Sequence, residues 1–355
     1  MTFAEHFLHS GTLFSVSPDK VIIGWGKRLK SDSPTSKGIP SFYFPDFFLT
    51  DQTPWCSYET WGEFHLDDLI KKLESLQLNK SFESLNWSHF SKEVFKTNFD
   101  VLKNLLISGA LVKGVPYIFE VAKSKMTPER LKASLLKLLQ TIKHKPMHGY
   151  GFWEDGQGIL GATPEILFRS SCPNNLILET MACAGTEKTD TPNSIRLKSP
   201  KERHEHALVI QGVQDSIESL GGTLKVHETK LLKLPLLNHL VTPLTVTFPE
   251  KISFDLIVKA LHPTPALGAI PRAEGMRWLD QLQKNLPRRR YGAPIAIIDA
   301  HGTQTTCAVA IRNVQWQDEW MSIGAGCGVV LESDFEQEWD ELHLKIASIK
   351  EILAL

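Results

Sequence analysis

The sequence has no excess charge of either sign, few cysteines and no long apolar run. Its 39 Lys and Arg residues are balanced by 40 Asp and Glu residues, which gives a formal net charge of −1. A balanced charge provides no basic field that would attract nucleic acid or an anionic membrane. No stretch approaches the roughly 20 consecutive apolar residues of a membrane-spanning helix. We therefore expect neither a nucleic-acid partner nor a membrane partner.

The cysteines form no C-x-x-C pair, which argues against a zinc ribbon and against a thioredoxin-type motif. The sequence holds five of them, at positions Cys56, Cys172, Cys183, Cys307 and Cys327. An odd and scattered set is typical of free thiols in a reducing compartment. The N-terminal residues MTFAEHFLHSG also lack the basic and apolar regions of a signal peptide. The sequence thus predicts a cytoplasmic protein.

Length and composition are those of a globular protein. A chain of 355 residues buries roughly three quarters of the surface that it exposes when unfolded. Its 42% of hydrophobic residues, 23 glycines and 20 prolines are ordinary values. No repeat, low-complexity tract or linker divides the chain. We expect one large domain, in which residues 1–100 supply N-terminal strands and helices and residues 101–355 form the functional region.

Hydrophobic periodicity indicates blocks of helices and blocks of strands. Thr127, Pro128 and Glu129 form a clear helix start, because Thr caps, Pro fits the first turn and Glu suits the helix dipole. Helices are predicted over 66–76, 88–107, from 127 onward, 201–220, 254–261, 272–286 and from 335 to the C-terminus. Strands are predicted at 21–25, 41–44, 149–153, 158–162, 166–169, 176–179, 224–227, 244–248, 294–299, 305–312 and 320–324. Without a regular strand–helix alternation, these blocks favour an α+β fold with antiparallel sheets over a doubly wound one.

Two of the predicted helices each carry a pair of glutamates three residues apart. Glu202 and Glu205 form one pair, and Glu338 and Glu341 form the other. This spacing places both carboxylates of a pair on one face of the helix. If the pairs meet in a cleft, a cation must neutralise them, and hard oxygen ligands favour Mg²⁺. The spacing alone leaves open the alternative that both pairs are solvated surface charge.

Other motifs indicate less. His204 and His206 are two residues apart and so lie on different helix faces, which argues against a zinc site. The segment Gly324–Gly328 resembles part of a dinucleotide fingerprint, but the next helix begins too late. It indicates backbone N–H groups near an anionic ligand, or a simple turn. Neither a P-loop nor a G-x-S-x-G elbow occurs. The run Arg288–Arg290 after Pro287 is predicted to be a solvated surface turn.

Several segments occur together and in a fixed order. They are Gly161–Glu165, Ala184–Thr186, Lys201–His206, Leu261–Ala266, Ala310–Arg312, Gly324–Gly328 and Glu338–Glu341. In this combination the sequence resembles the chorismate-utilising enzymes, a family that includes isochorismate synthase, salicylate synthase, aminodeoxychorismate synthase and the large subunit of anthranilate synthase. The resemblance covers about residues 109–350. It implies two facing antiparallel β-sheets wrapped by helices, with one site between them.

The resemblance also implies a substrate and a cofactor. The substrate is chorismate, a dicarboxylate, and Mg²⁺ bridges its ring carboxylate to the two glutamate helices. Glu205 and Glu341 match the direct metal ligands, and Glu202 and Glu338 match the residues that hold metal-bound waters. A further set of residues matches the family's substrate-binding positions, with Arg312 suited by its planar fork to the carboxylate of the enolpyruvyl arm. These are Gly185, Thr186, Ala266, Tyr291, Arg312, Gly326 and Lys345.

The residues that match the family's catalytic positions suggest the reaction. Formation of isochorismate adds water at ring carbon 2 while the hydroxyl at carbon 4 leaves, so it needs a base and an acid. Glu165 matches the general acid, and we expect a closed site and nearby carboxylates to raise its pKa toward neutral. Lys113 matches the lysine that activates water, which argues against the ammonia-using anthranilate synthases. Ala266 stands where salicylate and aminodeoxychorismate synthases typically carry Thr.

The sequence therefore predicts an Mg²⁺-dependent isochorismate synthase of a menaquinone or siderophore route, acting as a monomer or weak dimer. Pro116 departs from the family pattern soon after Lys113, and a proline is awkward inside a strand. Two alternatives stay open. One is a salicylate synthase, which also eliminates pyruvate. The other is a catalytically inactive family member that binds a dicarboxylate.

Overall fold

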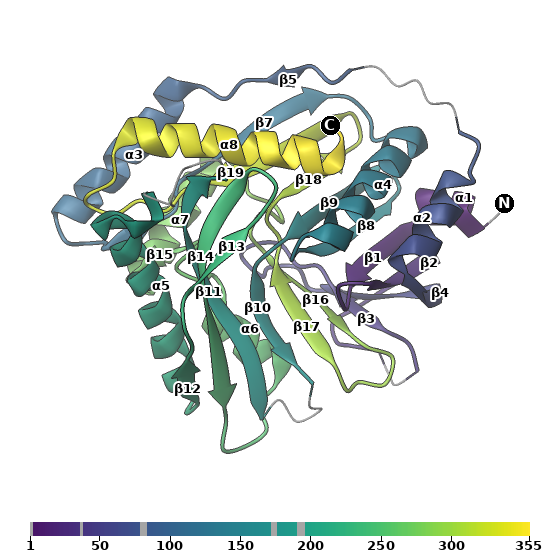
Figure 1. Cartoon of the computed structure of the whole chain (residues 1–355), viewed down its shortest axis with the longest axis horizontal. Coiled ribbons are helices and arrows are strands. Elements are labelled where there is room, and N and C mark those ends of the chain that lie inside the picture. The colour runs from purple at the N-terminus through teal and green to yellow at the C-terminus, as the bar shows by residue number, and fades with distance from the viewer. Residues whose placement is uncertain (1–2, 36–37, 79–83, 172–175, 190–195) are drawn as a thin grey trace.

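The computed structural model describes residues 3–35, 38–78, 84–171, 176–189 and 196–355 (Figure 1). Its strands pair antiparallel throughout the described residues, in a 17-stranded hydrogen-bonded network and a separate pair formed by β6 and β15. Helices cover this sheet from outside. The α+β class, the antiparallel pairing and the single domain are confirmed. The two facing sheets that were expected are joined in one continuous hydrogen-bonded network of strands.

The elements keep one numbering along the chain. The helices are α1 (Phe3–His9), α2 (Leu66–Glu74), α3 (Lys92–Ile107), α4 (Pro128–His144), α5 (Pro200–Glu218), α6 (Phe254–Leu261), α7 (Arg272–Asn285) and α8 (Phe335–Leu353). The strands are β1 (Gly11–Ser15), β2 (Lys20–Ser31), β3 (Ser41–Tyr43), β4 (Trp55–His65), β5 (Trp87–Ser88), β6 (Lys113–Gly114), β7 (Tyr117–Lys123), β8 (His148–Glu154), β9 (Gln157–Thr163), β10 (Ile166–Ser170), β11 (Ile177–Lys188), β12 (Thr223–Val226), β13 (Lys230–Lys233), β14 (Leu237–Thr247), β15 (Ala269–Ile270), β16 (Pro294–Ile298), β17 (Thr305–Val309), β18 (Asn313–Gln317) and β19 (Trp320–Gly326).

Strands from the first hundred residues pair directly with later ones. β1 lies beside β8, with Gly11 opposite Trp153. β3 lies beside β16, with Ser41 opposite Ile298. The N-terminal region is therefore built into the same sheet as the strands that follow it.

Local signals explain where the clearest helix begins. The Thr127 hydroxyl accepts a hydrogen bond from the backbone N–H of Arg130 at 3.3 Å, and Pro128 is the first residue of α4, as the sequence predicts. The leucines at helical spacing on its inner face are buried. α4 packs against α2 and α8. The buried leucines of α4 thus help to pack α2, α4 and α8 together on one side of the sheet.

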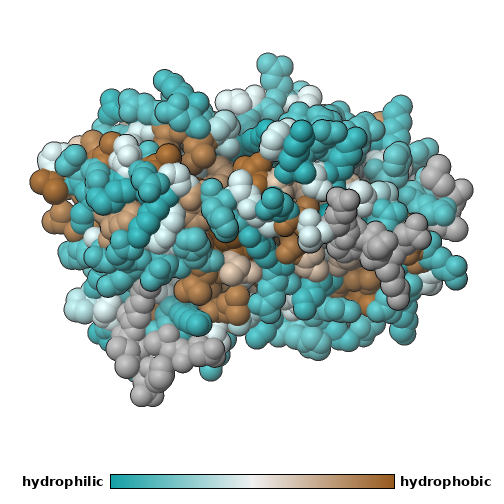
Figure 2. Space-filling view, turned by 90° about the horizontal axis from the view of Figure 1, so that it is seen from above, coloured by the Kyte–Doolittle hydropathy of each residue, from teal (hydrophilic) through white to brown (hydrophobic). Residues whose placement is uncertain are grey.

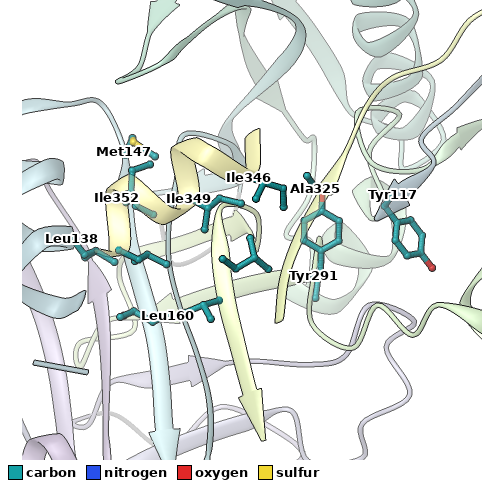
Figure 3. Close-up of a cluster of buried hydrophobic side chains, with 14 of the residues drawn as sticks. Tyr117, Leu138, Met147, Leu160, Tyr291, Ala325, Ile346, Ile349 and Ile352 are labelled. Atoms are coloured by element: carbon teal, nitrogen blue, oxygen red, sulfur yellow. The ribbon is translucent and has the colours of Figure 1, made fainter. Parts of the chain in front are cut away.

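The core lies between the helices and the sheet. In Figure 3, Ile349 and Ile352 of α8 lie near Leu138 of α4 and Leu160 of β9, within one cluster of buried side chains. Hydrophilic residues cover most of the face seen in Figure 2, with hydrophobic ones between them. The four described cysteines are free and buried, as expected of thiols; Cys172 lies outside the described residues. None of the described helices is long and apolar enough to cross a membrane.

Two helices and one long strand frame the site. α8 runs across the ends of the central strands, and α5 lies along β11 (Figure 1). β11 is much longer than the predicted strand at 176–179, since it continues through a bulge between Ala184 and Thr186. Just after that bulge, the backbone N–H of Thr186 donates to the Glu202 side chain of α5 at 3.3 Å. One glutamate from α5, Glu205, and one from α8, Glu341, line the same cavity.

Candidate active site

A cavity of about 80 Å³ lies where α5, α8, β11, β14 and β19 meet. It is lined by most of the residues that the sequence identified as site candidates. These are Glu165, Gly185, Thr186, Glu205, Ala266, Tyr291, Arg312, Gly326, Glu341 and Lys345. Three further candidates do not line the cavity but lie next to it: Lys113, Glu202 and Glu338. Lys113 pairs with Glu205 of the wall, and Glu202 and Glu338 both pair with Lys201. Glu202 also accepts a hydrogen bond from the backbone N–H of Thr186 in the wall. The predicted set is therefore brought together in one place.

All four glutamates of the two pairs are buried, so the alternative of solvated surface charge is wrong. The most exposed of them, Glu205, has an exposed fraction of 5%, and Glu202 and Glu338 have 1% each. Glu205 and Glu341 reach the cavity, whereas Glu202 and Glu338 stand behind them. This arrangement places one carboxylate from each helix at the cavity wall.

A lysine ammonium lies among three of these carboxylates. The Nζ atom of Lys201 is 2.9 Å from Glu338 Oε1, 3.1 Å from Glu202 Oε1 and 3.3 Å from Glu205 Oε2. Burial alone would lower the pKa of Lys201, but the surrounding carboxylates outweigh it and raise the pKa. Lys201 thus links α5 to α8 as a positive charge between the two acidic pairs.

The carboxylate cluster offers the type of ligand that a hard divalent cation prefers, but lysines pair with its carboxylates in this structure. Carboxylate oxygens are the ligands that Mg²⁺ prefers, and Lys201 shows that this cluster already holds a positive charge. Burial and the neighbouring Glu341 raise the pKa of Glu338 to about 7, and its Oε2 atom is buried without a hydrogen-bond partner. Among the described residues, no three His, Cys, Asp or Glu side chains stand ready to hold a metal ion. Lys201 and Lys345, the latter 2.8 Å from Glu341, pair with these carboxylates instead.

Glu165 has the properties of a carboxylic acid at neutral pH. It lies between β9 and β10 with an exposed fraction of 4%, and its backbone N–H donates to the Thr163 hydroxyl. Burial raises the pKa of Glu165 to about 7, while a hydrogen bond from Thr264 and the charges of Lys113 and Lys345 oppose that rise. The expected shift is present. The expectation that neighbouring carboxylates cause it is wrong, because the charged neighbours that act on it are lysines.

Lys113 is held at the cavity wall by a short strand. β6 pairs with β15, with Lys113 opposite Ile270, and Pro116 falls between β6 and β7, so it interrupts no strand. Lys113 Nζ donates to the Pro265 carbonyl at 2.8 Å and lies 3.3 Å from Glu205 Oε1. A Cβ on Gly328, which lines the cavity, would lie 2.8 Å from this Nζ. Because Gly328 has no side chain, the Lys113 amine can lie directly behind this part of the cavity wall.

Arg312 is a buried cation with two neutral partners. It adopts a left-handed backbone conformation, with φ of 56°. Its Nη1 donates to the Ser348 hydroxyl at 3.0 Å and its Nη2 to His239 Nε2 at 2.7 Å. No carboxylate within the described ranges forms an ion pair with it. Burial lowers the pKa of Arg312 to about 10, which leaves it charged at neutral pH. Its charge is available to an anionic ligand.

His239 of β14 lines the cavity but was not predicted. Burial and the charge of Arg312 lower its pKa to about 3, so the ring is neutral. Its Nδ1 lies 2.9 Å from the Gly185 carbonyl, so Nδ1 carries the proton and donates to that oxygen, while Nε2 accepts from Arg312. A single histidine in an apolar strand gives no local signal. Only the pairing of β14 with β11 places it here.

Close approach explains two of the glycines. Gly185 has φ of 75° at the bulge of β11, and a Cβ there would lie 3.0 Å from Glu202 Oε2. The next residue, Thr186, donates its backbone N–H to that same oxygen at 3.3 Å. Gly324 allows the ring of Tyr291 to lie against β19, since a Cβ would stand 2.8 Å from that ring. Residues 324–328 thus form the end of β19 and part of the cavity wall, and they are not a dinucleotide-binding motif.

Two other predictions are tested by burial. His206 is buried against the Thr242 hydroxyl at 2.7 Å, whereas His204 is largely exposed, so the two lie on different faces as expected. The predicted surface turn is wrong for Arg288, whose exposed fraction is 0%. Arg289 beside it is exposed, in agreement with the prediction.

Comparisons with known proteins show which family the chain resembles. Residues 121–354 match the family model described as "Chorismate binding enzyme". "Salicylate biosynthesis isochorismate synthase" of Pseudomonas aeruginosa is 31% identical over 200 residues, 55% of this chain and 42% of that protein. "Isochorismate synthase EntC" of Escherichia coli K12 is 24% identical over 311 residues, 84% of this chain and 76% of that protein. The chain thus spans less than half of the length of the first of these relatives.

A solved structure supports the fold. The putative 2,3-dihydroxybenzoate-specific isochorismate synthase DhbC of Bacillus anthracis superposes with a TM-score of 0.77 at 22% identity, over 99% of this chain and 100% of that one. Its likeness shows the same arrangement of sheet and helices. The family model covers well over half of the chain and includes both glutamate helices. The chain belongs to the chorismate binding enzyme family.

Proposed function

We propose that the protein is an isochorismate synthase, which converts chorismate to isochorismate with Mg²⁺ and serves a menaquinone or a siderophore/salicylate route. One observation carries the proposal: a buried carboxylic acid with a pKa near 7 and one glutamate from each of two acidic helices line one cavity, and the Lys113 side chain contacts one of these glutamates from behind the wall. The relatives named isochorismate synthase support the choice of reaction.

The chemistry needs a proton acceptor and a proton donor. Lys113 acts in this proposal as the base that takes a proton from a water molecule as it adds to ring carbon 2. The ring double bonds shift, and Glu165 gives its proton to the carbon 4 hydroxyl, which leaves as water. Water is thus consumed at one carbon and released at another, and the product is an isomer of the substrate. Burial raises the pKa of Glu165 to about 7, so a substantial fraction of this carboxyl holds the proton at neutral pH.

Two groups of charged residues would each bind one of the two carboxylates of chorismate. Mg²⁺ bound by Glu205 and Glu341 would neutralise the ring carboxylate, with Glu202 and Glu338 in support. Lys201 would have to give up its contacts with these carboxylates. Arg312 and Lys345, with the backbone at Gly326, would bind the carboxylate of the enolpyruvyl arm. Gly185, Thr186, Ala266 and Tyr291 would complete the cavity wall.

The product identifies the reaction. Purified protein incubated with chorismate and Mg²⁺ is expected to accumulate isochorismate, measured by chromatography against standards, and excess EDTA should stop the conversion. Salicylate together with pyruvate would show a salicylate synthase instead. No change in chorismate, in a protein that still binds it, would show the inactive family member.

The Thr264→Val substitution is expected to move the pH dependence. Thr264 Oγ1 donates to Glu165 Oε1 at 3.3 Å and so lowers the pKa of this carboxyl. Activity requires protonated Glu165, so kcat/KM of the wild type should fall as pH rises through about 7. Without the hydrogen bond the pKa rises further, and the alkaline limb should shift upward by roughly half a pH unit.

A matched control is Thr180→Val, which removes a buried hydroxyl that donates to the Leu167 carbonyl outside the cavity. Its pH profile should coincide with that of the wild type. An alkaline limb that stays in place in the Thr264 variant would contradict the role of Glu165 as the acid.

A further inference from the structure

Arg288 is a fully buried cation with no acidic partner. Its guanidinium carbon lies 3.7 Å from the ring centroid of Phe47, 4.5 Å from that of Tyr117 and 5.3 Å from that of Tyr291. No carboxylate of the described residues forms an ion pair with it. Burial lowers the pKa of Arg288 to about 10, so it stays protonated at neutral pH. Burying an unpaired charge is costly, and aromatic faces offset only part of that cost.

The guanidinium connects two separate parts of the active-site wall. Its Nε donates to the Tyr291 carbonyl at 3.3 Å, and its Nη1 donates to the Leu267 carbonyl at 3.2 Å. Both of these residues line the cavity, although one follows α6 and the other precedes β16. The Nη2 atom is buried without a hydrogen-bond partner. Two of the three guanidinium nitrogens therefore donate hydrogen bonds to residues of the cavity wall.

Tyr291 connects Arg288 to the part of the cavity lined by Gly326 and Lys345, where the carboxylate of the enolpyruvyl arm is proposed to bind. Its ring lies beside Ala325 of β19 (Figure 3) and close to Gly324, and its hydroxyl would be 3.3 Å from a Cβ at Gly326. The Gly326 carbonyl accepts a hydrogen bond from Lys345 at 2.8 Å. Tyr117, on the far side of Tyr291 in Figure 3, shares the same guanidinium. A shift of Arg288 would thus move the wall beside Lys345.

We propose that Arg288 is a positioning residue for the second carboxylate of the substrate: it holds Tyr291 and Leu267 in place around that carboxylate and adds an unpaired positive charge behind them. The proposal rests on the function proposed above. The carboxylate of the enolpyruvyl arm keeps its charge throughout the reaction, so contacts to it stabilise substrate and transition state equally. The loss of such contacts raises KM and leaves kcat nearly unchanged.

The test compares Arg288→Gln and Arg288→Lys with Arg289→Gln. Arg288→Gln removes the charge and should raise KM for chorismate by about tenfold or more, with kcat within about twofold of the wild type. Arg288→Lys keeps the charge but loses the planar fork, so a smaller rise is expected. Arg289, its exposed neighbour, provides the matched control and should show wild-type constants. Circular dichroism and thermal unfolding establish that each variant is folded.

The outcomes separate this proposal from the proposed function. If Arg288→Gln does not fold, the KM of Arg288→Lys decides. A lower melting temperature with unchanged KM, or a fall in kcat alone, would overturn the positioning role and leave a structural one. If the wild type makes no isochorismate, the proposed function fails. Calorimetric binding of chorismate with Mg²⁺ then tests Arg288 directly, and equal affinity in wild type and Arg288→Gln, or no binding by either, overturns it.

Discussion

Chorismate turnover is expected to fall by roughly 10²- to 10⁴-fold when Glu165 is replaced by Gln, the range that general acid catalysis contributes. Glutamine has the shape of the buried carboxylic acid but has no acidic proton to give to the leaving hydroxyl. Because Glu165 is neutral at the cavity wall below a pH of about 7, the substitution changes little charge there. The fold should therefore be retained. Initial rates of isochorismate formation measure the effect.

Glu120→Gln provides the matched control for that loss. Glu120 is also buried, with an exposed fraction of 3%, but it lies on β7, pairs with Lys350 and does not line the cavity. Its variant should keep kcat within about twofold of the wild type, since distant substitutions seldom affect catalysis directly. Nearly equal rates in the wild type and the Glu165 variant would show that the acid is misassigned.

The second large effect is expected for Glu341→Ala, which should abolish Mg²⁺-dependent activity, with a loss of about 10²-fold or more at any Mg²⁺ concentration. Glu341 supplies a cavity-lining carboxylate from α8, opposite Glu205 of α5. Without it, the cation that would neutralise the ring carboxylate in the proposed mechanism would lose one of its two protein ligands. Rates measured across a Mg²⁺ titration test the expectation, and circular dichroism shows that α8 is intact.

Glu336→Ala on the same helix is the control, because Glu336 is exposed and pairs with Lys92 at the surface. It should have the Mg²⁺ dependence of the wild type. A Glu341 variant whose activity responds to Mg²⁺ as the wild type does would refute the ligand assignment.

The sequence predicts those elements whose signals are local. Thr127 and Pro128 mark the start of α4, and the glutamate spacing places each pair on one face. The missed elements include α1, β1, β4, β7, β13 and β18. In β18, the buried positions include Asn313 and Gln315, whose amides bond to Tyr150 and to the Arg288 carbonyl. Buried polar residues remove the apolar alternation by which a strand is recognised.

The site residues differ in the same way: those in local motifs were predicted, and those placed by contacts between distant segments were not. The glutamates, Glu165 and Arg312 stand in contiguous motifs, so their resemblance to a family identified them. His239 and the burial of Arg288 depend on strand pairing and on rings from distant segments, such as Phe47. The contacts of Lys201 likewise need α5 and α8 to be brought together. Non-local contacts of this kind leave no pattern in a window of sequence.

Turnover in water enriched in ¹⁸O tests the central claim most directly. If Lys113 activates water for addition at carbon 2 while Glu165 expels the carbon 4 hydroxyl, isochorismate must carry one ¹⁸O atom, bonded to carbon 2, as mass spectrometry and nuclear magnetic resonance can show. Isochorismate formed without the label would mean that the original hydroxyl had moved within the substrate. That result would contradict the assignment of an acid and a base to opposite ends of the reaction.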